Sequence, residues 1–443
     1  MTDLLAARSQ MALSLAFHII FACIGMAMPL LMATAHALWL RTRRQVYYDL
    51  TKAWSRGVAI FFATGAVSGT ALSFELGLLW PGFMEHAGAI IGMPFSWEGT
   101  AFFVEAIALG LFLYGWNRLP DPVHWLSGVV VGLSGLASGM FVISANAWMN
   151  SPAGFDWVGG QAINIDPWAA MFNDRMLNMG IHMLIASVAA TGFAVAGLHA
   201  LLLIRNPGHL FHQKAIKIAL LFGSVAALVQ PVSGDLLAKE TAVKQPLKLA
   251  AMEAHFETEK GAGLLVGGIP DPDTGEVRYG FKIPWLLSVL AYGDPDATVK
   301  GLNDFPKEEH PNVLLTHLSF QIMVGLGSLM MLVGAGWHWL RWRKPQHMFS
   351  PRVLWILAVM TPSGFLAVEA GWCVTELGRQ PWIIYGVMKT KDALTPMPGL
   401  WLPFTLFTGV YVILSVVLVF LMIRQIRSIP AHYSQGAGEN PDA

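Results

Sequence analysis

The stretch MALSLAFHIIFACIGMAMPLLMATAHALWL, residues 11–40, decides the fold, because it contains no Lys, Arg, Asp or Glu. About 20 mostly apolar residues are enough for a helix to cross a bilayer. The segment before this stretch carries Asp3 and Arg8, and no small-residue cleavage site follows it. We therefore expect a first membrane-spanning helix here, not a removable signal peptide.

The composition of the whole chain agrees with a membrane protein. Of its 443 residues, 55% are hydrophobic and 13% are charged, against roughly 25% charged in a soluble domain. The 28 Lys and Arg balance the 28 Asp and Glu, so no basic excess is present to neutralise nucleic acid phosphates. A nucleic acid partner is excluded. Cys23 and Cys373 stand in apolar runs without a CxxC or CxxCH motif, which excludes a disulfide scaffold, a cysteine-held metal and covalent haem c.

Apolar runs of spanning length recur along the chain, and they predict an all-α, polytopic membrane helix bundle with about nine transmembrane helices. The expected spans are residues 11–40, 55–80, 97–116, 124–146, 175–204, 214–237, 312–341, 352–377 and 400–424. An odd number of spans leaves the two termini on opposite sides of the membrane.

Basic residues set the expected orientation, because cytoplasmic loops collect Lys and Arg. The connections after the odd-numbered spans are basic, whereas the connections 81–96 and 147–173 contain no Lys or Arg. We therefore expect the N-terminus outside and the C-terminus in the cytoplasm. The basic residues at the expected cytoplasmic ends are Arg41, Arg43, Arg44, Lys52, Arg118, Arg205, Lys214, Lys217, Arg341, Arg343, Lys344, Arg424 and Arg427.

One long connection divides the chain. We expect helices one to six in residues 1–237, an external loop in 238–311, helices seven to nine in 312–427 and a cytoplasmic tail in 428–443. Loops as long as 238–311 are usually functional or disordered. Its part 239–260 has the composition of a short helix near the membrane surface, and the turn formers of 267–281 predict a small hairpin.

Ionisable residues inside the expected spans are the candidate functional residues, because a charge in hydrocarbon costs at least about 2.5 kcal/mol. Each residue is weak evidence alone. A lone histidine in a membrane span hydrogen-bonds the backbone of a neighbouring helix about as often as it binds a metal, and a lone methionine usually only fills space between helices. With the expected orientation, the candidates gather in the outer half of the bilayer. They are His18, Glu75, Glu98, Glu105, His182, Met323, Glu369 and Glu376.

These residues fit two kinds of functional site. Glu98 and Glu105 are seven apart on one helix face, which fits a proton relay or the cation site of a transporter. Histidine and methionine are usual ligands of haem iron, so His18, His182 and Met323 fit haem binding. His36, His199 and His338 lie toward the cytoplasmic ends, where contact with water is the simpler explanation, and they are set aside.

The chain resembles subunit I of the cytochrome bd-type quinol oxidases from the first span to the end of the ninth. The most specific match is GWCVTELGRQPW at 371–382, which contains the family's GW…E…GRQPW signature. The other matching segments are ARSQMALSLAFHIIF around His18, WEGTAFFVEA around Glu98 and Glu105, ANAWMNSP around Asn146, MGIHM around His182, KLAAMEAHFET around Lys248 and Glu253, and FQIMVG around Met323.

The resemblance implies a set of haem ligands. His182 and Met323 would be the axial ligands of a low-spin haem b. His18 and Glu376 would hold the two high-spin haems of the oxygen site, one b and one d, and the resemblance leaves open which residue serves which haem.

The same resemblance implies roles outside the iron ligands. Lys248 and Glu253 would bind the quinol in the external loop, and Trp372 would lie between haems. Arg379 and Arg8 would lie near haem propionates or the carboxylate ligand.

The chain departs from well-known members in two places. Gln321 stands where those members have an arginine, and Glu98 and Glu105 are one residue closer together. Both features resemble the cyanide-insensitive branch, in which the third haem is b or d. The external loop is also short.

We therefore predict a subunit of an electrogenic quinol:oxygen oxidoreductase in the bacterial cytoplasmic (inner) membrane. Quinol would be oxidised outside and O2 reduced to water with protons drawn from the cytoplasm through groups such as Glu105, so that no pump is needed. The resemblance implies a smaller membrane subunit II and leaves room for a small single-span subunit.

Three alternatives remain at this point. An ion-coupled transporter would use the carboxylates but needs no His182 and Met323 pair. A membrane haem b protein that does not reduce O2 would lack an open haem. A copper-containing oxidase is disfavoured, because its metal site needs several clustered histidines, and the outer half offers His18 and His182 with His317 near the boundary.

Overall fold

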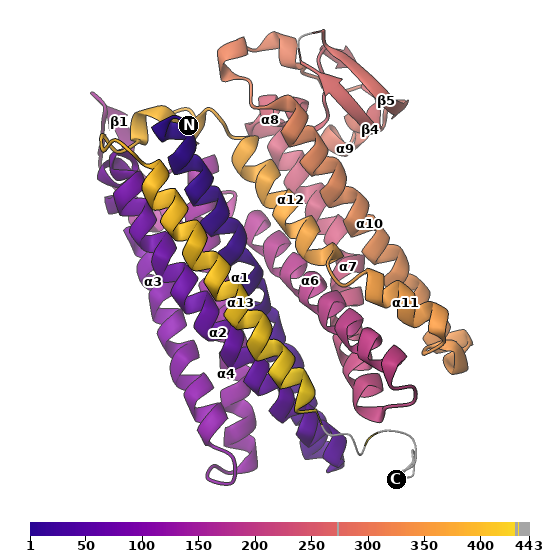
Figure 1. The fold of residues 1–443 in the computed structure, drawn as a ribbon. Coiled ribbons are helices and arrows are strands. Elements are labelled where there is room, and N and C mark those ends of the chain that lie inside the picture. The colour runs from indigo at the N-terminus through magenta and orange to yellow at the C-terminus, as the bar shows by residue number, and fades with distance from the viewer. Residues whose placement is uncertain (273, 430–432, 434–443) are drawn as a thin grey trace.

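The computed structural model is a bundle of long helices with small β-hairpins at one end (Figure 1). It describes residues 1–272, 274–429 and 433. Within these residues, nine helical segments are long and apolar enough to span a membrane, which confirms the predicted polytopic all-α class. The spanning helices are α1 (Asp3–Thr42), α2 (Gln45–Leu79), α3 (Pro81–Tyr114), α4 (Asp121–Asn150), α6 (Met176–Arg205), α7 (Leu210–Lys244), α10 (Val313–Arg343), α11 (Pro351–Val359) with α12 (Ser363–Leu377), and α13 (Trp401–Arg427).

The spanning helices form two groups of four. In the first group, α1 packs against α2 and α4, and α3 closes the square against the same two helices. In the second group, α6 and α10 both pack against α7 and α12, so they occupy opposite corners. The groups meet where α1 and α4 contact α6, and α13 covers α1 and α2 from outside (Figure 1).

The third helix is longer than expected, and the prediction that residues 81–96 form a connection was wrong. These residues are the first turns of α3. Pro81 stands at the start of the helix, where a missing backbone N–H costs nothing. Phe83, Ile90 and Ile91 are buried in the cluster that joins α3 to its neighbours. Pro94 lies inside the helix.

The eighth span is interrupted, although a single helix over 352–377 was expected. Residues 360–362 separate α11 from α12, and Pro362 lies in this break. A proline inside a helix removes one hydrogen bond and clashes with the preceding turn. The break makes α12 a short helix of 15 residues, with Glu376 in its last turn.

The connections at one end carry the small elements. The predicted hairpin is confirmed, since β4 (Leu264–Asp271) pairs antiparallel with β5 (Glu276–Ile283). The predicted short helix in the same connection is α8 (Pro246–Met252). Two further short helices are α5 (Pro167–Met171) and α9 (Leu286–Tyr292). Three further antiparallel strand pairs are β1 (Asp156–Val158) with β2 (Gln161–Ile163), β3 (Glu259–Lys260) with β6 (Thr298–Val299), and β7 (Trp382–Ile384) with β8 (Met388–Lys389). The 3-10 turns among the described residues are Leu302–Asp304, Lys307–Glu309, Pro345–His347 and Thr390–Ala393.

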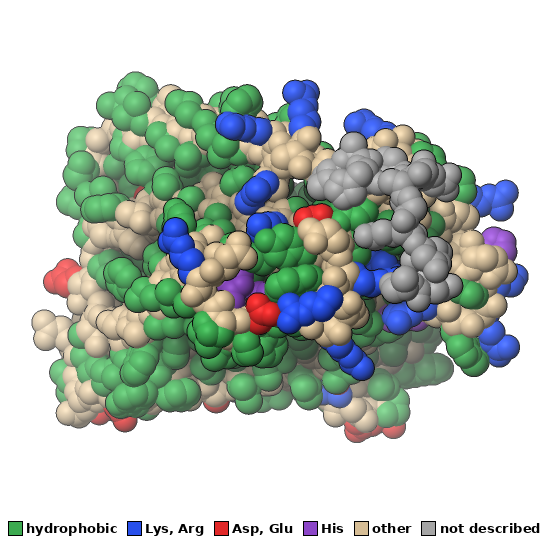
Figure 2. All heavy atoms as spheres, turned by 90° about the horizontal axis from the view of Figure 1, so that it is seen from below, with side chains coloured by type: hydrophobic (Ala, Val, Ile, Leu, Met, Phe, Trp, Pro, Cys, Tyr) green, Lys and Arg blue, Asp and Glu red, His purple; other side chains and the backbone are tan. Residues whose placement is uncertain are grey.

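The two ends of the bundle differ in charge. The end that carries residue 1, α8 and the β4–β5 hairpin is called the loop end (Figure 1). At the opposite end Lys and Arg side chains stand out on the surface (Figure 2), and we call it the basic end. It holds the connections 43–44, 115–120, 206–209 and 344–350.

The close crossing of α6 and α7 gives a test of the packing. A Cβ added at Gly192 of α6 would lie 2.5 Å from the Cα of Gly223 on α7, whereas one added at Gly110 of α3 meets no described atom within 4 Å. Gly192→Ala should therefore force the two backbones apart and lower the stability by about 1–3 kcal/mol. Gly110→Ala gains the same helix propensity as Gly192→Ala but creates no clash, so it serves as the control. Thermal unfolding of the detergent-solubilised protein measures both, and equal midpoints would contradict the close crossing.

Candidate functional site

Glu376 lies at the meeting point of the two helix groups. Its carboxylate accepts a hydrogen bond from Nη2 of Arg379 at 2.5 Å and another from Nδ2 of Asn146, on α4, at 2.7 Å. Arg379 is only 2% exposed. Its Nε and Nη1 are buried without a hydrogen-bond partner among the described residues. The signature motif therefore puts a half-buried carboxylate and a buried guanidinium with unused donors between α4 and α12.

Lys248 joins the same network from α8. Its Nζ donates to Oδ1 of Asn150 at 3.2 Å and to the carbonyl of Thr375 at 3.1 Å. Asn150 in turn donates to the backbone carbonyl of Asn146 at 2.9 Å and to its side-chain Oδ1 at 3.3 Å. Burial, with two nearby guanidinium groups, lowers the pKa of Lys248 well below its ordinary value. A continuous series of hydrogen-bonded side chains thus leads from Lys248 to Glu376.

Arg175 holds the start of α8 in place, and sequence reasoning missed it. Its guanidinium donates to Oε1 of Gln245 at 2.9 Å and to Oγ1 of Thr241 at 2.8 Å. Gln245 donates to the carbonyl of Asn150 at 3.0 Å. Arg175 is buried and is the first residue of the span expected over 175–204, where it was given no role.

Glu253 follows α8 and is buried at 5% exposure. In the described part of the chain its Oε2 has no hydrogen-bond partner. Burial raises the pKa of Glu253 to about 8, so the carboxyl is protonated at neutral pH. An unpartnered buried carboxyl one turn beyond Lys248 is available to a ligand.

His317 and Gln321 of α10 fix the hairpin beside this segment. Nε2 of His317 lies 3.1 Å from the carbonyl of Gly267, and its Nδ1 lies 2.8 Å from the carbonyl of Met252. Gln321 accepts from the amide of Gly267 at 3.0 Å and donates to the carbonyl of Leu265 at 3.2 Å. The residue that departs from the family's arginine is therefore a backbone clamp on β4.

His18 faces α2. Its Nδ1 lies 2.9 Å from Oγ of Ser68, and that hydroxyl donates to the carbonyl of Thr64 at 3.0 Å. Because the serine proton is used on the backbone, Nδ1 of His18 is the donor, and the lone pair stays on Nε2. This is the arrangement in which a histidine binds a metal. Gly69 leaves space next to the ring, since an added Cβ would lie 3.0 Å from Cε1.

His182 faces α7 in the same way. Its Nδ1 lies 3.0 Å from Oγ of Ser233, which donates to the carbonyl of Gln230. Nε2 of His182 is 3.1 Å from Nε2 of Gln230, so this amide covers the lone pair. An iron at Nε2 would require the Gln230 side chain to turn away. Gln230 is a second residue that sequence reasoning missed.

Met323 faces Gly371 across α10 and α12. A Cβ at Gly371 would lie 3.0 Å from its sulfur. His182 and Met323 come from α6 and α10, the opposite corners of the second helix group. Both residues lie in the half of their helices nearer the loop end. A flat group between those corners could take one ligand from each side.

Trp372 lies where the two helix groups join. It packs in the cluster that holds Ile19 and Cys23 of α1 and Ala190 of α6. Its Nε1 and Oε1 of Glu369 are buried without partners in the residues that the structure covers. Together with Arg379, these atoms make the junction richer in unsatisfied polar groups than a helix interface tolerates.

The carboxylates of the first helix group differ in depth and partners. Glu105 is buried at 6% exposure, and both its oxygens would lie 3.5 Å from a Cβ at Gly135 of α4. Glu98 is half-buried two turns nearer the loop end. Glu75 is buried and accepts from Oγ of Ser14 at 2.7 Å. Arg8 is exposed on the first turns of α1.

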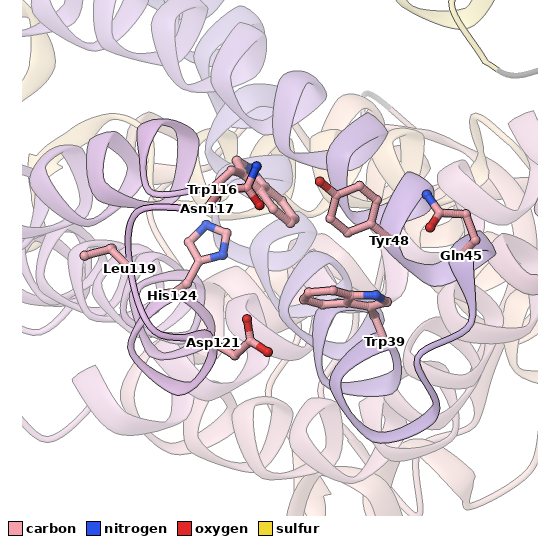
Figure 3. Close-up of a pocket in the computed structure, with 8 residues that line it drawn as sticks. All are labelled: Trp39, Gln45, Tyr48, Trp116, Asn117, Leu119, Asp121 and His124. Carbon is pink, nitrogen blue, oxygen red and sulfur yellow. The ribbon is translucent and has the colours of Figure 1, made fainter.

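A separate pocket of about 380 Å³ opens at the basic end (Figure 3). Aromatic rings line it, and Arg43 pairs with Asp121 at its edge at 2.7 Å. It lies between the turn that joins α1 to α2 and the turn that joins α3 to α4, at the opposite end of the bundle from Glu376 and Lys248. The residues drawn are Trp39, Gln45, Tyr48, Trp116, Asn117, Leu119, Asp121 and His124.

The donor set fits haem better than a bare metal ion. In the described residues, no group of three or more His, Cys, Asp or Glu side chains could hold an ion. Haem iron needs only one or two protein ligands. His18 and Met323 each present a ligand atom beside a glycine, and His182 can present Nε2 once the Gln230 side chain turns away. The unpaired donors of Arg379 and Trp372 fit the propionates and edge of such a group.

The sequence comparisons decide the family. Residues 6–430 match the family model described as cytochrome bd terminal oxidase subunit I. The chain belongs to that family. Membership makes it an oxidoreductase subunit of the respiratory chain, implies haem cofactors and implies work with a subunit II.

Named relatives cover almost the whole cytochrome bd subunit. A Bacillus subtilis (strain 168) protein, named provisionally as subunit I of a cytochrome bd menaquinol oxidase, is 34% identical over 99% of this chain and 100% of its own length. Subunit 1 of the cytochrome bd ubiquinol oxidase from the same organism is 32% identical over 98% of this chain and 95% of its own. A chain of the solved bd oxidase from Geobacillus thermodenitrificans superposes with a TM-score of 0.91 at 37% identity, over 97% of this chain and 99% of that one.

Proposed function

We propose that this subunit oxidises a membrane quinol beside α8 and supports reduction of O2 to water at haems held by α1, α6, α10 and α12. The observation that carries the proposal is the hydrogen-bonded series from Lys248 through Asn150 and Asn146 to Glu376. It joins Lys248, one of the two expected quinol residues, to the expected iron ligand of the signature motif. The names of the relatives, which mention menaquinol and ubiquinol, support a quinol as the donor.

The haem assignment follows the ligand chemistry. We assign His182 and Met323 to a low-spin haem b, and His18 and Glu376 to two high-spin haems, one of type b and the other of type d or b. When bound, these groups supply iron that carries electrons and binds oxygen. Ser68 and Ser233 hold the imidazoles in the tautomer that keeps the lone pair on Nε2, and at His182 the Gln230 amide turns away before iron binds there. Arg379 holds the Glu376 carboxylate and has donors left for a propionate.

The quinol residues divide the binding work. The Nζ of Lys248 is held by two acceptors, so it offers its third donor direction to a quinol oxygen. The unpartnered carboxyl of Glu253 accepts the quinol proton once it is ionised. Both side chains are buried, which keeps competing water away from the ring.

The orientation of the subunit in the membrane determines on which side protons are released and on which side they are taken up. The basic end supports a cytoplasmic placement of the turns 43–44 and 344–350, with α8 outside, in the bacterial cytoplasmic membrane. Quinol protons then leave outside, and protons for water enter from the cytoplasm. Glu105, buried deeper than Glu98 and facing Gly135, carries protons toward the junction. No pump is required.

The low-spin assignment is tested by spectroscopy. His182→Ala and Met323→Leu should each remove or convert the low-spin b signal in reduced-minus-oxidised spectra, because each deletes one axial ligand. A carbon-monoxide-reactive haem should remain in both. Unchanged low-spin bands in both variants would refute the assignment, and a colourless wild-type protein would favour a transporter.

The quinol assignment is tested by turnover. Lys248→Ala and Glu253→Ala should lower quinol oxidation by about 100-fold, the usual size of a lost acid–base group. Haem spectra and oxygen uptake with an artificial electron donor should stay intact. Lys282→Ala and Glu276→Ala, exposed in the same connection, are matched controls. Normal quinol turnover in both test variants would move the site elsewhere.

The pH profile tests the role of Glu253. Its pKa is raised by burial to about 8, so the fraction that can accept a proton increases as the pH rises through that value. The kcat/KM for quinol should therefore rise between about pH 7 and 9 in the wild type. In Glu253→Gln this rise should disappear, and a profile that keeps its shape would exclude Glu253 as the acceptor.

The two carboxylates of the oxygen side should behave differently. Glu376→Ala should lose high-spin haem, measured as haem per protein and as the carbon monoxide difference spectrum. Glu105→Leu should keep its haem but slow oxygen reduction about 100-fold, and Glu105→Asp should recover part of the rate. Full turnover of Glu105→Leu at full haem content would show that protons take another route.

A further inference from the structure

The β4–β5 hairpin exposes an unusual set of large apolar side chains. Tyr279 is 90% exposed, Phe281 63% and Trp285 61%, and Ile283 adds 38%. Tyr279 and Trp285 also have left-handed backbones, with φ of 61° and 59°, a conformation that is costly for bulky residues. Such a group of aromatics at the surface marks an interaction site.

The two faces of β5 differ. Phe281 and Ile283 are two residues apart and share a face, where they pair with Val266 and Leu264 of β4. Lys282 lies between them on the opposite face and forms an ion pair with Glu259 at 3.5 Å. The strand is therefore amphipathic while both of its faces are exposed.

The clamp on α10 sets the depth of the hairpin. His317 and Gln321 bind the backbone of Leu265 and Gly267 on either side of Val266. These two residues lie four and eight positions into α10, which is about 6–12 Å from its first residue. α10 has 31 residues, or about 46 Å, close to the roughly 40–45 Å of a bilayer with its headgroups. The pair Val266 and Phe281 thus stands near the boundary between headgroups and acyl chains.

The neighbouring surface of α10 is itself apolar at this level. Leu315 is 48% exposed and Ile322 50%, as expected for a helix that faces lipid. Tyrosine and tryptophan concentrate at this depth in membrane proteins, because the ring is apolar and its polar edge stays wet.

We infer that the β4–β5 hairpin is an interfacial membrane anchor, with Phe281, Ile283 and the rings of Tyr279 and Trp285 inserted into the lipid boundary beside α10. The occupant of this face is the bilayer, not a second protein. The depth of α8 is linked to that of the hairpin, because His317 of α10 contacts both Gly267 of β4 and Met252 at the end of α8. The inference does not depend on the proposed quinol chemistry.

The test uses the purified oxidase with all its subunits in vesicles of phosphatidylcholine and phosphatidylglycerol. The background is Cys373→Ser, since Cys373 is exposed and Cys23 is buried. An environment-sensitive dye is attached at Phe281→Cys or at the matched control Lys282→Cys, the adjacent residue on the other face. Quenching is measured with nitroxide-labelled lipids and with aqueous iodide.

The lipid nitroxide should quench the dye at 281 at least about twofold more strongly than the dye at 282, because an inserted face lies roughly 5–10 Å into the boundary between headgroups and acyl chains. Iodide should give the reverse order. Equal quenching of both positions by iodide would show a hairpin in water and overturn the inference. Protection of 281 from both quenchers would show a covering protein and would also overturn it. If Phe281→Cys does not assemble, Tyr279→Cys gives the same comparison at a side chain that is 90% exposed.

Discussion

The structure depends on one interaction between the two helix groups, in which a carboxylate that is paired with a buried guanidinium on one group accepts a hydrogen bond from the other group. Glu376 and Arg379 sit at the end of α12, and Asn146 reaches them from α4. Removing one partner of a buried ion pair costs about 3–5 kcal/mol, because the other charge is left in a low dielectric. The hydrogen bond from Asn146 to Glu376 therefore fixes the register of α12, in the second helix group, against α4 in the first.

The rest of the loop end follows from that register. With α12 fixed against α4, the carbonyl of Thr375 and the amide of Asn150 lie where Lys248 reaches both. α8 is then held at its start by Arg175 and at its end by His317. A segment of seven residues is thus tied to four spanning helices, and a shift of any of them moves the candidate quinol residues.

Most of the fold could be predicted from the sequence, because hydrophobic length is a local property. Eight of the nine apolar runs correspond to uninterrupted spanning helices, and the hairpin at 264–283 followed from its turn formers. The start of α3 and the break at 360–362 were missed. Prolines such as Pro81 and Pro94 end a helix only in some contexts. Burial of Phe83 and Ile91 makes residues 81–96 helical, and that burial depends on residues distant in the sequence.

The candidate site was predictable only in part. The signature motif and the charge penalty pointed to Glu376, Arg379 and the histidines. The residues that orient them, such as Ser68, Ser233 and Asn150, are common polar residues in apolar helices and carry no local signal. Gln230 and Arg175 act on partners 48 and 70 residues away, and only the helix arrangement reveals such pairs.

The unequal ends of the bundle have a practical consequence for handling the protein. Its 28 basic and 28 acidic residues cancel, yet Lys and Arg outnumber Asp and Glu on the basic end (Figure 2). The molecule is therefore a strong electric dipole with no net charge. In detergent at low ionic strength, such molecules attract one another end to end, and salt screens the attraction within roughly 10 Å at 0.1 M. The chain should also bind both cation and anion exchange resins near neutral pH, each by a different end.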